Sequence, residues 1–120
     1  ALLDEGTLRE YIGICDGLGL SALTEAHDEE EIAMAVKAGA RIIGVNNRNL
    51  KDFTVDVNNS GRLRKLVPSH VLFVAESGIK SAEDIRTLKK AGVNGVLIGE
   101  TLMKSSNKKA TLDELRKGCL

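Results

Sequence analysis

The sequence predicts an α/β fold in which parallel β-strands alternate with α-helices. Short runs that are apolar on nearly every residue recur along the chain, as strands do when helices cover a parallel sheet. Amphipathic segments of helical length separate these runs. The stretch 30–45 (EEIAMAVKAGARIIGV) also aligns with 83–98 (EDIRTLKKAGVNGVLI) at a constant offset, which indicates a repeated strand-and-helix unit.

A helix is predicted at the start of the chain, within residues 1–19. Its apolar side chains fall at helical spacing and two glycines lie near its end: Leu8, Tyr11, Ile12, Cys15 and Leu18, with Gly17 and Gly19. Because the chain begins at Ala1 inside this pattern, we interpret that start as a cut.

Two predicted strands flank the next helix. SALTEAH (21–27) predicts a short strand that ends at Glu25, and RIIGVN (41–46) predicts the second strand. The helix over 28–39 has an N-cap at Asp28, and Glu31 can reach back to complete a capping box. Its predicted buried stripe and its stop are Ile32, Ala35 and Val36, then Gly39.

The second half of the chain repeats this alternation after a polar loop. We predict a helix near 58–66 that ends before Pro68, a strand over 70–76, and a capped helix over 81–92 with Ile85 and Leu88 inward. A fourth strand over 94–99 leads into a short helix at ETLM. The segment KSSNKKA (104–110) is predicted to be a solvated loop.

Composition limits the class of protein. With 120 residues, 42% of them apolar and 28% charged, the chain is predicted to form a single domain over 1–120. No apolar run reaches the ~20 residues of a membrane helix, and no signal peptide is visible. Two distant cysteines fit a reducing compartment, so a cytoplasmic location is predicted. Balanced charge and three aromatic residues argue against a nucleic-acid partner.

The carboxyl ends of the strands are where a parallel α/β protein binds ligands. Four such strands fit either an open flavodoxin-like sheet or half of a (βα)8 barrel, and composition does not decide between them. The residues at these ends are Glu25, Asn46, Glu76-Ser77-Gly78 and Gly99-Glu100. Glycines here allow a ligand to approach backbone N–H groups, so these strand ends are either simple turns or a phosphate-binding site.

Four segments make a family resemblance specific: TEAHDEEEI, GARIIGVNNRNLKDFTVD, VAESGIKSAEDI and AGVNGVLIGETLM. In this order and spacing they resemble the C-terminal half of indole-3-glycerol phosphate synthase. The resemblance covers essentially the whole chain and implies strands five to eight of a TIM barrel, a partial domain without its N-terminal half. It implies closure of the pyrrole ring of 1-(2-carboxyphenylamino)-1-deoxyribulose 5-phosphate, with loss of carbon dioxide and water. It implies neither a metal nor an organic cofactor.

The same resemblance implies roles for individual residues. Glu25 matches a catalytic carboxylate and Asn46 an asparagine that holds the substrate hydroxyl. Ser77, Gly78 and Gly99 match the substrate-binding loops that receive the phosphate. Glu100 stands where some members have serine, so we expect its backbone N–H to serve while its side chain points away. In the family, the lysines that act as general acids lie on early strands that this chain does not contain. Residues 1–120 alone are therefore expected to be inactive.

Several of these features also have a plain structural interpretation. His27 is expected to stabilise the turn before the 28–39 helix, and Asn47 is expected to be a turn residue. The acidic run DEEE fits the positive end of a helix dipole better than a metal site.

Two other functions remain open at the level of sequence: a non-catalytic phosphate-binding half-barrel, and half of another phosphate-binding barrel such as phosphoribosylanthranilate isomerase. A half-barrel would expose strand edges and an apolar face. Self-association, or pairing with the missing half, is therefore expected.

Overall fold

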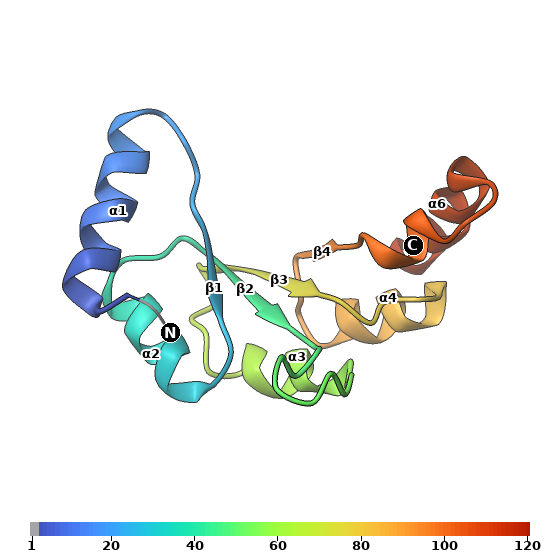
Figure 1. Cartoon of the computed structure of the whole chain (residues 1–120), viewed down its shortest axis with the longest axis horizontal. Helices are drawn as coiled ribbons and strands as arrows, with labels where there is room; N and C mark the ends of the chain where they lie inside the picture. Colours follow the sequence, from blue (N-terminus) through green and yellow to red (C-terminus); the bar gives the residue numbers. More distant parts are fainter. Residues whose placement is uncertain (1–2) are drawn as a thin grey trace.

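The computed structural model describes residues 3–120 as four parallel strands alternating with helices (Figure 1). Strand order in the sheet follows the sequence, β1-β2-β3-β4, and every neighbouring pair is parallel, so the predicted α/β fold is confirmed. No helix in this described range has the length and apolar character to cross a bilayer. The elements are α1 Glu5–Gly17, β1 Leu23–Ala26, α2 Glu29–Lys37, β2 Ile42–Asn46, α3 Asn58–Arg64, β3 Leu72–Glu76, α4 Ala82–Lys90, β4 Gly95–Leu97, α5 Glu100–Met103, α6 Lys108–Arg116 and the 3₁₀ helix η1 Lys117–Cys119.

Some boundaries differ from the sequence prediction. β1 runs on to Ala26, while β4 is shorter than predicted and ends at Leu97. The prediction of a loop over 104–110 was wrong in part, because α6 begins at Lys108. Asn107 explains that start: its side chain accepts a hydrogen bond from the N–H of Ala110 at 3.0 Å, which satisfies a free donor of the first turn. Residues 1 and 2 of the predicted first helix lie outside the described range.

Helix capping follows the sequence with one correction. Asp28 accepts from the N–H of Glu31 at 2.8 Å, as predicted for the N-cap of α2. Glu31 does not complete a capping box. Its carboxylate reaches one residue further back and accepts from the N–H of His27 at 2.8 Å. The complete capping box is on α4, between Ser81 and Asp84.

The sheet has two different faces. On the covered face, on the side of the sheet where α2, α3 and α4 lie (Figure 1), the strand residues are almost completely buried: Thr24, Ala26, Ile43, Val45, Phe73 and Ala75. The open face presents the alternate residues, which the parallel register aligns in rows across the strands: Leu23, Glu25, Ile42, Gly44, Asn46, Leu72, Val74, Glu76, Gly95 and Leu97. Its leucines at 23, 72 and 97 are 46%, 50% and 54% exposed.

The apolar interior forms two clusters. The larger lies between the covered face and the helices of the first half, and it includes Ile12, Ile32, Leu63 and Phe73. The smaller joins the C-terminal elements and comprises Ala75, Ile79, Ile85, Leu88 and Leu115. Val93 packs against both clusters. The radius of gyration is 15.0 Å, against about 13.6 Å for a compact domain of this length, so the body is extended.

Candidate functional site

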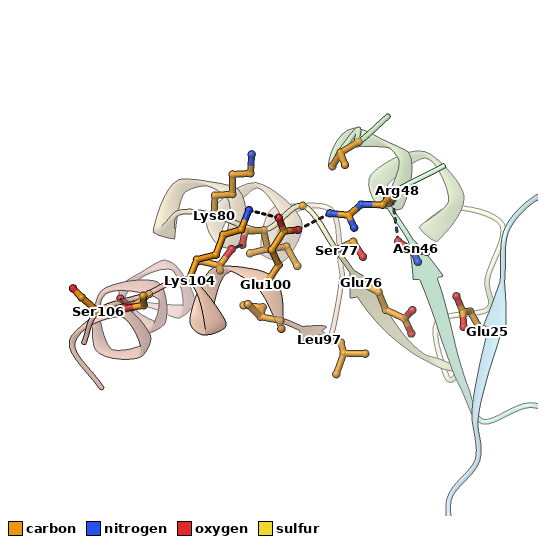
Figure 2. A pocket seen from close by; sticks show the side chains of 18 residues that line it. Glu25, Asn46, Arg48, Glu76, Ser77, Lys80, Leu97, Glu100, Lys104 and Ser106 are labelled. Atoms are coloured by element: carbon orange, nitrogen blue, oxygen red, sulfur yellow. Dashed lines mark hydrogen bonds and ion pairs between the residues drawn. The ribbon is translucent and has the colours of Figure 1, made fainter. Parts of the chain in front are cut away.

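A pocket of about 1160 Å³ lies at the carboxyl ends of the four strands. The six residues predicted from the sequence all line it: Glu25, Asn46, Ser77, Gly78, Gly99 and Glu100 (Figure 2). They come from all four strand ends, although up to 75 positions separate them in the chain. This convergence is what the parallel topology predicts.

Glu25 lies on the open face near the end of β1 and is partly exposed. One of its carboxylate oxygens is 3.4 Å from Nε2 of His27, whose Nδ1 is 2.9 Å from Glu31. His27 thus bridges β1 and α2, as expected for a residue that stabilises this turn. Burial opposes ionisation of Glu31, but its hydrogen bonds with the His27 ring and backbone prevail and lower its pKa.

Glu76 is the carboxylate that the sequence prediction did not select. It ends β3 on the open face and is only 7% exposed. Its carboxyl group lies over Gly44, where an added Cβ would come within 2.4 Å of Oε1. Burial, then the negative charge of Glu25, raise the pKa of Glu76 against the opposing effect of His27. Its position at a strand end was the only sequence signal for it.

The turn after β2 is built by two adjacent asparagines. The side-chain oxygen of Asn46 accepts from the N–H of Arg48 at 3.0 Å, a local bond that bends the chain (Figure 2). Asn47 is more than a turn residue, because it is 3% exposed and donates to the carbonyl of Ser77 at 3.1 Å. It therefore ties the β2 loop to the β3 loop on the other side of the strand end.

Ser77 and Gly78 form a tight bend after β3. Both have positive φ, +67° and +74°. For a serine this left-handed conformation costs about 1 kcal/mol. Gly78 has a second constraint, since an added Cβ would lie 2.2 Å from Cγ1 of Val55. Only glycine combines this backbone angle with this contact, so the bend keeps the pocket wall open.

Gly99 immediately precedes α5, and Glu100 is the first residue of that helix. The expectation that the Glu100 side chain points away was wrong. It lines the pocket, 2.6 Å from Arg48 and 2.7 Å from Lys104 (Figure 2). These hydrogen bonds, first from Lys104 and then from Arg48, lower the pKa of Glu100 to about 2.

Three cationic side chains line the pocket, and the sequence prediction named none of them: Arg48, Lys80 and Lys104. They come from the β2 loop, the β3 loop and the residue that follows α5, so only the fold brings them together. Among residues 3–120, no three His, Cys, Asp or Glu side chains gather as metal ligands would.

A parallel sheet with helices on one face and a polar pocket at the carboxyl ends of its strands is typical of part of an α/β barrel, in which ligand sites lie at those ends. The family model for indole-3-glycerol phosphate synthase matches residues 1–115. The chain belongs to this family, and its four strands are the C-terminal half of a TIM barrel.

Curated relatives agree with this assignment. The chain is 62% identical over 116 residues to the indole-3-glycerol phosphate synthase of Ruminiclostridium cellulolyticum, covering 97% of this chain and 45% of that protein. It is 58% identical to the enzyme of the same name from Leuconostoc mesenteroides, covering 97% and 44%. The chain therefore spans somewhat less than half the length of the relatives that it matches.

Solved structures with low sequence identity share the fold. The BexX/CysO complex of Amycolatopsis orientalis superposes with a TM-score of 0.71 at 16% identity, over 96% of this chain and 48% of the other. A native KDPGal structure gives 0.66 at 17% identity, over 98% and 53%. In both cases this chain covers about half of the other chain, as expected for half of a barrel.

Proposed function

We propose that this chain supplies the strand-five-to-eight side of an indole-3-glycerol phosphate synthase active site. The reaction closes the pyrrole ring of 1-(2-carboxyphenylamino)-1-deoxyribulose 5-phosphate and releases carbon dioxide and water. The observation that carries the proposal is the convergence in one pocket of the five family-matched residues together with Glu100. High identity to enzymes of that name supports it.

Glu25 acts in this proposal as the carboxylate that accepts a proton and balances the cationic intermediate. Its partial exposure in the pocket leaves its oxygens accessible to substrate. Asn46 holds the substrate hydroxyl. Glu76, with its raised pKa and its place beside Glu25, is suited to hold or release a proton in the same reaction.

The phosphate group binds at the bend of Ser77 and Gly78 and at Gly99. These residues follow β3 and β4, which are neighbours in the sheet, so their loops meet at one end of the pocket. Backbone N–H groups at such loops can bind a dianion directly, because glycine has no side chain that would keep the dianion away from the backbone. The nearby cationic side chains supply the opposite charge.

Residues 1–120 form one partial domain in this proposal and lack the early-strand lysines that act as acids. The open face then requires a cover, which is either the N-terminal half of a barrel or a second copy of the chain. Exposed leucines on that face support this requirement. A cytoplasmic location stays a prediction.

The test is to join the chain to the N-terminal part of the Ruminiclostridium cellulolyticum relative and to measure indole-3-glycerol phosphate by fluorescence. The hybrid should turn over substrate, whereas the 120 residues alone should be slower by several orders of magnitude because the lysine acids are absent. Turnover by the chain alone within about tenfold of the hybrid would contradict the proposed division of roles.

A hybrid that folds and binds phosphate without turnover would instead favour a non-catalytic phosphate-binding half-barrel. The three cations in the pocket are the observation that keeps this second function in view.

A further inference from the structure

The cations of the pocket are not equally available to a ligand. Arg48 and Lys104 both contact the Glu100 carboxylate, at 2.6 Å and 2.7 Å on its two separate oxygens. Lys80 makes no ion pair within the described residues. Figure 2 shows Glu100 between its two partners. One carboxylate, with a single negative charge, therefore occupies two of the three cations that a phosphate could use.

The bridge between Arg48 and Glu100 is not a local helix contact. It joins residues 52 apart in sequence, from the loop after β2 to the helix after β4. A contact between Glu100 and Lys104 alone would be an ordinary i,i+4 pair. The added contact with Arg48 joins the loop after β2 to the start of α5, so the Glu100 carboxylate links two walls of the pocket.

Phosphate oxygens seek the same partners as a carboxylate, through similar charge-assisted hydrogen bonds. A phosphate that approaches Arg48 and Lys104 also meets the negative charge of Glu100. The two anions repel each other, so they do not share the cations without a cost. Bound ligand and intact bridge are therefore competing states.

We propose that Glu100 is an internal competitor: its carboxylate occupies the cationic end of the pocket in the free protein, and a phosphorylated ligand must displace it from Arg48 and Lys104. The inference rests on the phosphate site proposed above. Because the competitor carries one negative charge, a phosphate dianion displaces it more effectively than a monoanion does. Glu100 thus lowers affinity for anions in general and favours doubly charged ones.

The test uses the whole 120-residue chain, inorganic phosphate as ligand, and calorimetric titration near neutral pH. Glu100→Gln removes the competing charge and should bind phosphate about tenfold more tightly than the wild type. Glu29→Gln is the matched control, since Glu29 is an exposed carboxylate that forms an inter-element ion pair with Arg62 at 2.8 Å and does not line the pocket. Its phosphate affinity should equal that of the wild type.

A second measurement covers the case in which the Glu100→Gln variant does not fold. In the wild type, saturating phosphate should shift the carboxyl ¹³C resonance of Glu100 and leave that of Glu29 in place. Phosphate binding that leaves the Glu100 resonance unmoved overturns the inference.

The outcomes separate this inference from the proposed function. If wild type binds phosphate and the Glu100→Gln variant binds it equally or more weakly, Glu100 positions the cations and is no competitor, while the phosphate site stands. If neither binds phosphate, the phosphate site fails and the inference fails with it.

Discussion

The covered and open faces of the sheet are made by alternate residues of the same four strands, yet they differ in almost every property. Phe73 on the covered face is completely buried, whereas its neighbour Leu72 on the open face is 50% exposed. The covered face is apolar except for Thr24. The open face carries Leu23 and Leu72 at the amino ends of β1 and β3. At the carboxyl ends of β2 and β3 it carries Asn46 and Glu76, with Leu97 beside them on β4.

This difference separates stability from chemistry within one sheet. Residues of the covered face stabilise the fold because they are buried against helices of the same chain. The open face holds the candidate catalytic groups but has no comparable cover among the described residues. The experiments below test this division, beginning with the largest expected effect.

The first experiment asks whether the open face needs a partner. We predict that the chain self-associates or pairs with an N-terminal half, with a dissociation constant near micromolar, or about 8 kcal/mol. Leu23→Lys on edge strand β1 should weaken the association, whereas Leu112→Lys on α6, at nearly the same exposure (44% against 46%), should not. Sedimentation equilibrium measures both. A single 12.9 kDa species with a cooperative thermal transition would show that the chain closes its own core.

The second compares neighbours on opposite faces. Phe73→Ala should lower the free energy of unfolding by about 3–5 kcal/mol, because it leaves a cavity in the larger cluster. Leu72→Ala should cost about 1 kcal/mol or less, since half of that side chain already meets solvent. Urea denaturation of both variants provides the comparison. Equal costs would mean that the open face is covered after all.

The third concerns the chemistry of the open face, measured in the hybrid barrel. Glu25→Gln keeps the shape of the side chain but removes the proton acceptor. Turnover should fall about a hundredfold, or about 2.7 kcal/mol in the barrier, with little change in substrate affinity or unfolding free energy. Unchanged turnover would return Glu25 to a purely structural role.

The smallest effect is the pH dependence of Glu76. Its pKa in the folded chain is raised above the ordinary value of 4.5, so below that value both folded and unfolded chains are protonated and nothing is lost. As pH rises through the window from 4.5 to the raised pKa, the unfolded chain ionises first and stability falls. Glu76→Gln should remove this loss.

The stability difference between Glu76→Gln and the wild type should therefore be more favourable to the variant at about pH 8 than at about pH 4. Denaturation at both pH values measures it, with Glu114→Gln, outside the pocket, as the control. A difference that is the same at both pH values would contradict the assignment.

Much of the fold was predictable because its signals are local. Apolar runs gave the strands to within a few residues, and Asp28 and Ser81 marked helix starts through their own side chains. The six site residues could be predicted because family motifs and strand ends coincide there, although their roles remain proposals.

What could not be predicted depends on long-range contacts. The burial of Glu76 requires its carboxyl group to lie over Gly44, thirty-two positions earlier in the sequence. Likewise, the orientation of Glu100 depends on Arg48, which approaches it only through the fold. The start of α6 is a different case, since Asn107 was a readable N-cap within a segment that looked like a loop.

The division of the interior into two clusters that meet at Val93 has a consequence for motion. Loops that carry Ser77, Gly78 and Gly99 lead into the smaller cluster, which rests on few side chains. Such a unit opens at lower free energy than the larger one, without global unfolding. Amide hydrogens of α4 and α6 should then exchange with solvent faster than those of β2 and β3. The loops after β3 and β4 would then open locally while the larger cluster stays folded.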